Sequence, residues 1–279
     1  MEPPRASSLA LLAPGAPSHG AFAPGKGQRL PAVDDRLVAP ESHAEIVDGR
    51  VYRTMGANPP HATQHAGVTH VFAGVLAEGY SVAVDMLTRA DEESDAAPDV
   101  SIFPSAPDPA TGGRQIEEIA FEVLDTERLA RTLDKVEKFA KRGVRRLFAV
   151  RVASRKVYEW DHAHHDWTEL DAGAEITDRC FRVPVPVAAL VDRVLADDTV
   201  ARALLVSRNR VIERALAERE ARGELRSLAG AVLRVLARRG VSVDDAARAR
   251  VLDCEERVAL EAWLDRAATA TTAGDVFEA

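Results

Sequence analysis

The sequence contains little cysteine, few aromatic residues and no long hydrophobic run. Two cysteines among 279 residues, Cys180 and Cys254, are too few for a disulfide framework or a cysteine-rich zinc site, so we expect a reducing, cytoplasmic setting. No apolar run is long enough to span a bilayer, and a signal peptide is not expected. The sequence also lacks a Walker-type phosphate loop and a nucleophile-elbow serine or cysteine, which excludes those catalytic classes.

An excess of basic residues is also missing. The 36 Lys and Arg residues stand against 44 Asp and Glu residues, which gives a formal net charge of −8 and excludes a uniformly basic protein that coats nucleic acid. The charge is nevertheless uneven, because residues 119–160 contain 11 basic and 6 acidic side chains. We interpret this block as a solvated helix face, with contact to phosphate groups as the alternative.

Composition divides the chain into three regions. Residues 1–36 are rich in proline, alanine, glycine and serine, which predicts a disordered tail. Residues 37–183 alternate strand and helix patterns, and residues 184–279 have a helical pattern. Within the helical region, residues 201–239 contain 10 basic and 4 acidic side chains around an intermittent apolar stripe. This segment favours a partner-binding or dimer-forming helix, with an arm that touches phosphates as the alternative.

The middle region has the pattern of a mixed α/β domain. The predicted elements are a hairpin that turns at Asp48-Gly49, a helix over 65–76, strands over 82–88 and 99–103, a buried strand over 119–124, an amphipathic helix over 129–142, a buried strand over 147–150 and an edge hairpin of 156–160 with 167–170. The acidic residues 90–95 are expected to form a turn. The strand–helix–strand order around 119–152 predicts two parallel strands with a right-handed crossover.

Glu122 is the residue of these strands that most needs an explanation. A carboxylate between Phe121 and Val123, in a strand that is apolar on both faces, is costly to bury unless a positive group pairs with it. Three interpretations are open. Glu122 pairs with an arginine such as Arg128 or Arg146, lies at a water-exposed strand end, or binds a metal ion.

Asp99 and Lys135 support the metal interpretation. If the strands of Asp99 and Glu122 are neighbours, both carboxylates can meet on one side of the sheet, and an oxygen-only ligand set suits Mg²⁺ or Mn²⁺. A phosphodiester hydrolase uses such an ion to activate water and to neutralise charge in the transition state. Lys135 can reach this position if the predicted helix folds back on the sheet.

The order and spacing of these residues resemble a branch of the PD-(D/E)xK nuclease superfamily, a bacterial group of restriction-endonuclease-like proteins. The resemblance covers about residues 37–170 and is carried by Glu45 to Gly49, His65, Pro98-Asp99, Phe121 to Leu124, and Lys135. It implies an α/β fold with a restriction-endonuclease-like mixed β-sheet core and flanking helices, followed here by the helical C-terminal region. It also implies a DNA-cleaving site that depends on Mg²⁺ or Mn²⁺.

The resemblance also implies roles for individual residues. Asp99 and Glu122 are implied as metal ligands, and Asp99, Glu122 and Lys135 as the catalytic set. Leu124 stands where the motif usually has lysine, and Lys135 on the following helix is implied as its replacement. Glu45 is implied to line the cleft, with a surface strand residue as the alternative.

The resemblance also implies that His65, which matches a helix-start histidine of the family, lines the cleft, with a helix-capping or packed histidine as the alternative. We predict phosphate contacts for Lys138, Arg142 and Arg146, although cations at the end of a helix also stabilise its carboxyl terminus.

Other conspicuous residues have structural interpretations. His162, His164 and His165 are expected in a turn rather than at a metal ion. Trp160 and Trp167 are expected to form a cross-strand pair rather than a platform on which bases stack.

The leading hypothesis is a cytoplasmic, Mg²⁺-dependent DNA endonuclease that forms a homo-oligomer, a dimer through the C-terminal helices, and that does not bind membranes. The alternative is a catalytically inactive nuclease fold that binds nucleic acid or serves in assembly. A third hypothesis is a plain structural core in which Glu122 pairs with an arginine and faces the opposite side of the sheet from Asp99. Because the chain is acidic, we expect modest and salt-dependent affinity for DNA.

Overall fold

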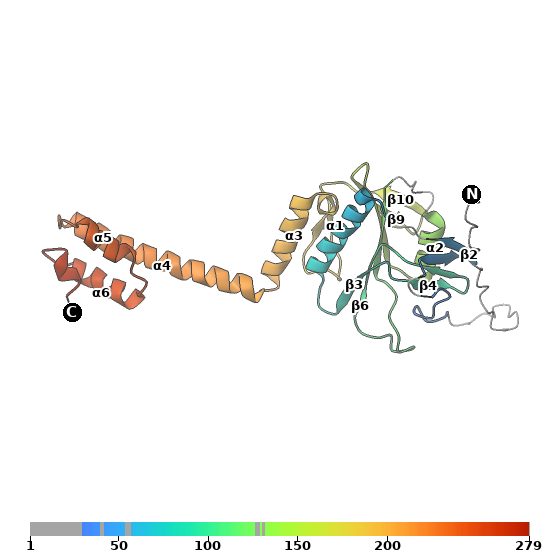
Figure 1. The fold of residues 1–279 in the computed structure, drawn as a ribbon, viewed down its shortest axis with the longest axis horizontal. Helices are drawn as coiled ribbons and strands as arrows, with labels where there is room; N and C mark the ends of the chain where they lie inside the picture. The colour runs from blue at the N-terminus through green and yellow to red at the C-terminus, as the bar shows by residue number, and fades with distance from the viewer. Residues whose placement is uncertain (1–29, 40–41, 54–56, 126–128, 130–131, 279) are drawn as a thin grey trace, which may run out of the picture.

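The computed structural model describes residues 30–39, 42–53, 57–125, 129 and 132–278. Figure 1 shows a lobe rich in β-structure at one end and a helical lobe at the other, with helix α4 (Arg210–Arg238) running between them. The mixed α/β architecture with a helical C-terminal region is therefore confirmed. Within the described residues, no helix combines the length and the apolar character needed to cross a membrane.

The main sheet has six strands in the order β10-β9-β8-β7-β6-β3. Its members are β3 (Tyr80–Val84), β6 (Val100–Pro104), β7 (Ile119–Leu124), β8 (Arg146–Arg151), β9 (Lys156–Asp161) and β10 (Asp166–Glu169). β7 and β8 are parallel, as predicted, and the other neighbours are antiparallel. All six residues of β7 are buried, since helices cover both faces of the sheet at this point.

A second sheet has four short strands in the order β2-β1-β5-β4. They are β1 (Ala44–Val47), β2 (Arg50–Arg53), β4 (Thr88–Asp91) and β5 (Ser94–Ala96). The predicted hairpin turn is confirmed, because Asp48 and Gly49 both have positive φ, at 50° and 69°, as a type I′ turn requires.

The predicted turn is confirmed at Glu92 and Glu93, but the other residues of 90–95 belong to strands β4 and β5, which were not predicted. The side chains of Ser94 and Asp95 are buried and make specific hydrogen bonds. The Asp95 carboxylate accepts from the backbone N–H groups of Leu37 and Val38, and the Ser94 hydroxyl accepts from Asp48 N. Strands are recognised in a sequence by alternating apolar and polar residues, and this acidic segment lacks such alternation.

Residues 30–38 extend the domain toward the N-terminus. Val33 and Val38 are buried, Arg89 N donates to the Val33 carbonyl at 2.9 Å, and the Arg142 guanidinium donates to the Pro31 carbonyl. The predicted tail boundary at residue 36 is therefore too late. The rest of that predicted tail, residues 1–29, lies outside the described residues.

Helix α1 (Pro59–Val75) lies on one face of the main sheet and buries Val68, Val71, Phe72 and Val75. It begins six residues before the predicted start at His65. Asn58 caps it by accepting from His61 N at 3.1 Å, and the two prolines stand at the first turn, where a missing N–H costs nothing. Helix α2 (Leu133–Arg142) lies on the other face and ends at Gly143, whose φ of 114° is left-handed.

The chain then leaves the sheet for a mostly helical region. The remaining elements are β11 (Glu175–Ile176), β12 (Val185–Pro186), η2 (Val187–Leu190), α3 (Arg193–Val206), α4, α5 (Asp245–Leu252), α6 (Arg257–Ala267) and η3 (Gly274–Val276). The predicted long helical stretch from Val200 is divided, because Arg208 adopts a positive φ of 52° and Asn209 caps a new helix by accepting from Val211 N.

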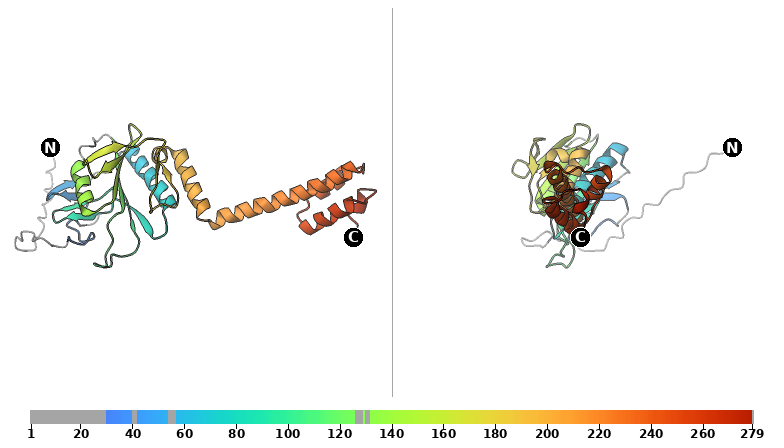
Figure 2. Two further views of the ribbon diagram at one scale, coloured as in Figure 1. Left: turned by 180° about the vertical axis from the view of Figure 1, so that it is seen from behind. Right: turned by 90° about the vertical axis from the view of Figure 1, so that its left-hand side faces the viewer.

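The helical lobe has a core of its own. The second half of α4 packs against α5 and α6 through a shared set of buried residues, which includes Ala229, Val232, Leu236, Val251 and Leu260. The first half of α4, by contrast, has no buried residue from Arg210 to Arg222. The left view of Figure 2 shows this part of the helix standing away from both lobes.

Three phenylalanines hold α1 and the centre of the sheet together. The ring centroids of Phe72 and Phe121 are 4.4 Å apart, and those of Phe121 and Phe148 are 4.9 Å apart. All three side chains are fully buried, so the rings contribute both apolar burial and aromatic contacts.

We expect Phe121→Ala to lower the free energy of unfolding by about 3–5 kcal/mol, because it leaves a cavity between Phe72 and Phe148. Urea denaturation followed by circular dichroism measures this change. Val258→Ala, at a side chain that is 77% exposed, is the control and should change stability by less than about 0.5 kcal/mol. Equal effects of the two substitutions would contradict the assignment of the core.

Candidate active site

Residues from five parts of the chain meet where the two sheets and helices α1 and α2 approach one another. The set consists of Glu45 on β1, His61 and His65 on α1, Asp99 immediately before β6, Glu122 on β7 and Lys135 on α2. Every residue of the predicted catalytic set is among them, as are both predicted cleft residues.

The Lys135 ammonium lies between two carboxylates. Its Nζ is 3.1 Å from Glu45 Oε1 and 3.1 Å from Glu122 Oε1, and it donates to the Ala97 carbonyl at 2.6 Å. Glu122 therefore has a lysine as its partner rather than Arg146, which binds Glu159 instead. Arg128, the other arginine considered, lies outside the described residues.

Asp99 lies on the same side of the sheet as Glu122. The antiparallel register pairs Val100 with Phe121, so Asp99, the residue before β6, lies opposite Glu122. Residues that are directly opposed on neighbouring strands point to the same face of the sheet. Asp99 Oδ2 accepts a hydrogen bond from Val123 N, which holds the carboxylate beside Glu122. The third hypothesis, which needs Asp99 and Glu122 on opposite faces, does not fit this arrangement.

Two further residues at the site were not predicted. His61 Nε2 is 3.7 Å from Asp99 Oδ1, and Asp85, with a positive φ of 48°, donates its N–H to the Asp99 carbonyl at 3.3 Å. The same carbonyl contacts His65 Nε2. The four-residue spacing of His61 and His65 would place both side chains on one face of a helix. This signal was not used, because the helix was expected to begin only at His65.

The electrostatics of the site centre on Glu122. Burial raises the pKa of this carboxyl to about 8, with a further contribution from Asp99 and Glu45, and Lys135 only partly opposes the rise. Burial would lower the pKa of Lys135, but the three carboxylates outweigh it and raise this pKa above its usual range, so the ammonium stays charged.

Asp99 behaves in the opposite way to Glu122. Burial would raise the pKa of its carboxyl, but the interaction with His61, the charge of Lys135 and the hydrogen bond from Val123 outweigh burial and lower it. Asp99 is therefore the ionised carboxylate of the pair, whereas Glu122 is held near the point at which it takes up a proton.

The three predicted phosphate contacts have other partners. Lys138 Nζ lies 2.6 Å from a carboxylate oxygen of Asp48 and 2.6 Å from one of Asp91. Arg142 donates to the backbone carbonyl of Pro31, and Arg146 forms a bidentate pair with Glu159 at the start of β8, level with Ile119. These cations hold parts of the domain together, and contact with phosphate stays a prediction for all three.

The turn predicted for the three histidines and the cross-strand pair predicted for the two tryptophans are both present in the structure. Residues 162–165 form the turn between β9 and β10, where His164 contacts Asp161 and His165 contacts Glu137. Trp160 and Trp167 are cross-strand partners, with ring centroids 5.4 Å apart and planes at 75°.

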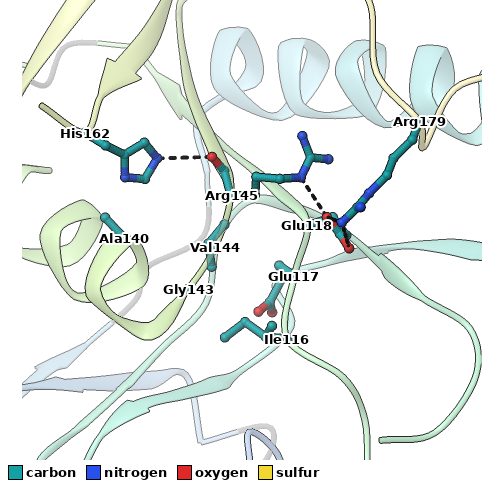
Figure 3. A pocket seen from close by; sticks show the side chains of 9 residues that line it. All are labelled: Ile116, Glu117, Glu118, Ala140, Gly143, Val144, Arg145, His162 and Arg179. Atoms are coloured by element: carbon teal, nitrogen blue, oxygen red, sulfur yellow. Dashed lines mark hydrogen bonds and ion pairs between the residues drawn. The ribbon is translucent and has the colours of Figure 1, made fainter.

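A concavity of about 410 Å³ lies at the opposite end of β7 from Glu122. Figure 3 shows two ion pairs and one hydrogen bond there. Arg145 and Arg179 both contact the Glu118 carboxylate, at 2.8 and 2.6 Å, and His162 Nε2 is hydrogen-bonded to the Arg145 carbonyl. Because the charges at this position are mutually satisfied, and none of the predicted catalytic residues lines it, we do not assign the active site there.

The arrangement is that of a nuclease-like α/β domain with a partly buried cluster of carboxylates and one lysine. Residues 28–181 match a family model, Uma2, described as "Putative restriction endonuclease". The chain belongs to this family, and the resemblance predicted from the sequence is confirmed.

Comparison with solved structures found the crystal structure of "a putative nuclease belonging to DUF820" from Anabaena variabilis ATCC 29413. It is 12% identical to this chain, with a TM-score of 0.45, and the match covers 55% of this chain and 92% of the other. A comparison with curated proteins found no match.

We expect Glu122→Gln to stabilise the metal-free protein at pH 8 but not at pH 5. The unfolded carboxyl loses its proton near pH 4.5, whereas the folded one keeps it to about pH 8, so stability falls as the pH rises between these values. Glutamine cannot ionise, and the gain should be about 1–3 kcal/mol at pH 8. Urea unfolding in the presence of EDTA at both pH values measures it.

Glu169→Gln is the matched control, because Glu169 is a half-exposed partner of Lys156. Its effect on stability should be small at both pH values. If Glu122→Gln destabilises the protein equally at pH 5 and pH 8, the raised pKa of Glu122 is contradicted.

Proposed function

We propose that this protein is a metal-dependent endonuclease that hydrolyses phosphodiester bonds in DNA, with Asp99, Glu122 and Lys135 as its catalytic set. The observation that carries the proposal is the Lys135 ammonium, which contacts the buried Glu122 carboxylate beside Asp99 on one face of the sheet. This is the set implied by the family resemblance, with lysine supplied by the helix after β7.

The residues fit a divalent cation held by Asp99 and Glu122. Glu45, Asp85, Asp99 and Glu122 place four carboxyl groups around one ammonium, which leaves an excess of negative charge. The raised pKa of Glu122 shows the cost of ionising it there, and a nearby cation would reduce that cost. Hard carboxylate oxygens suit Mg²⁺ or Mn²⁺.

When bound, such an ion supplies an activated water and neutralises charge on the reacting phosphate. The protein contributes Lys135, whose ammonium is fixed by Glu45, Ala97 and Glu122. Because the pKa of Lys135 is raised, the ammonium keeps its protons and can donate hydrogen bonds to the attacking water and to the phosphate oxygens. This supports an orienting and charge-stabilising role for Lys135 rather than that of a general base.

Glu45 serves as a positioning residue for this lysine. Its Oε1 accepts from both Lys135 Nζ, at 3.1 Å, and Ala97 N, at 2.8 Å, so the carboxylate ties β1 to the chain just before Asp99.

An inactive nuclease fold that binds nucleic acid or serves in assembly is the second candidate. It is favoured by the ion pairs that engage Lys138 and Arg146, since these cations are then less available to phosphate. Cleavage by the purified protein distinguishes the two candidates. We also propose a cytoplasmic location, for which the two unpaired cysteines are the support.

We expect the purified protein to nick plasmid DNA in the presence of Mg²⁺ or Mn²⁺ and to be inactive in EDTA. Asp99→Ala, Glu122→Gln and Lys135→Ala should each lower the rate by at least about 100-fold, because each removes a charge that acts on the transition state. Gel electrophoresis of supercoiled plasmid over time measures the rate.

Lys141→Ala is the matched control for Lys135, since Lys141 lies on the same helix and is 74% exposed. It should cleave at the rate of the unchanged protein. Full cleavage by Asp99→Ala or Glu122→Gln would rule out the proposed site, and cleavage in EDTA would rule out the metal.

We further propose that a second copy of the chain binds along the exposed half of α4. Helical spacing places Glu213, Glu220 and Glu224 on one side of α4 and Arg219, Arg222 and Arg226 on the other. Two parallel α4 helices can therefore place the acidic side of each beside the basic side of the other.

The double substitution Arg222→Glu with Arg226→Glu should weaken this dimer by at least about tenfold, because it sets like charges against each other. Sedimentation velocity over a concentration series measures the dissociation constant. Arg193→Glu, at an exposed position on α3, is the control and should leave it unchanged. A chain that is monomeric at every concentration would contradict the proposal.

A further inference from the structure

We infer a second metal subsite, of a different chemical class, formed by His61, His65 and Asp99 and suited to a transition-metal ion such as Co²⁺ or Zn²⁺. The inference deepens the proposed function, because Asp99 is shared with the proposed Mg²⁺ site. Its two other ligands, however, belong to α1 and have no part in the catalytic set.

The geometry of the three side chains supports a common ion. His61 and His65 are four residues apart on α1, which places both imidazoles on the same side of the helix. One ligand atom from each of the three residues lies within 4.8 Å of the others. Ligands that share one ion at about 2.0–2.2 Å lie about 3–4 Å apart, so only small side-chain rotations are needed.

The backbone around these ligands is held in place. Asn58 caps the first turn of α1 by accepting from His61 N, which fixes the start of the helix that carries both histidines. Val123 N holds Asp99 Oδ2, so that Oδ1 is the oxygen on the side of His61. The first-turn cap and the strand hydrogen bond thus orient the ligands from two separate elements.

The site is partly open to solvent and surrounded by negative charge. The His61 side chain is 25% exposed and that of Asp99 is 18% exposed, which leaves access for an ion and for water ligands. Asp85 interacts electrostatically with His65, Asp99 and His61, so it adds a carboxyl group close to the cluster. Both features favour a cation.

The chemistry of the ligand atoms determines which metal ion this subsite prefers. Two imidazole nitrogens with one carboxylate bind first-row transition-metal ions much better than Mg²⁺, which prefers oxygen ligands and keeps its waters. The two subsites therefore differ in selectivity. Asp99 with Glu122 offers only oxygen, whereas Asp99 with the histidines offers nitrogen as well.

The test is a titration of the full-length, untagged protein with Co²⁺, followed by its visible d–d absorption, which reports ligation directly. We expect saturable absorption bands for the unchanged protein. His61→Ala and His65→Ala should each weaken Co²⁺ binding by at least about tenfold. His164→Ala, at an exposed histidine in the β9–β10 turn, is the control and should bind as the unchanged protein does.

Glu122→Gln separates this inference from the proposed function. It should lose Mg²⁺-dependent nicking but keep the Co²⁺ bands, because Glu122 is not a ligand of the second subsite. The inference is overturned if Co²⁺ does not bind, or if binding survives His61→Ala and His65→Ala. Bands that disappear in Glu122→Gln but persist in both histidine variants would place Co²⁺ at the oxygen-only site and would also overturn it.

Discussion

The contact between the Lys135 ammonium and the carboxylates of Glu45 and Glu122 is the interaction on which the rest of the domain depends. Glu45 belongs to the small sheet, Glu122 to the main sheet and Lys135 to the helix between β7 and β8. Three elements far apart in the sequence are therefore joined at one largely buried cation. A buried charge needs such partners, because desolvation would otherwise make the fold unfavourable.

The ion pair with Lys135 does not fully offset the cost of ionising the buried Glu122 carboxyl. The part of this cost that remains is informative about function. One ammonium faces several carboxyl groups, and burial raises the pKa of Glu122 to about 8. A domain selected only for stability would gain by replacing this glutamate with a neutral residue. Groups that cost stability in the absence of a ligand are typical of sites that bind one.

The core of the site could be predicted because it follows from strand order. Once residues 99–103 and 119–124 are neighbouring strands, Asp99 and Glu122 must approach each other, and the helix after β7 brings Lys135 back over the sheet. The carboxylate and carbonyl partners of Lys138, Arg142 and Arg146 could not be predicted in this way. The partner of Lys138 at Asp48 is 90 residues away, and a basic residue in the sequence does not show which carboxylate will bind it. His61 was missed for a local reason, since Pro59 and Pro60 resemble a break in a helix although they begin one.

Anomalous diffraction from crystals of the protein grown with Mn²⁺ tests the central claim most directly. We expect an anomalous peak within coordination distance of carboxylate oxygens of both Asp99 and Glu122, with Lys135 beside it. A peak elsewhere on the molecule, with none between these two carboxylates, would contradict it.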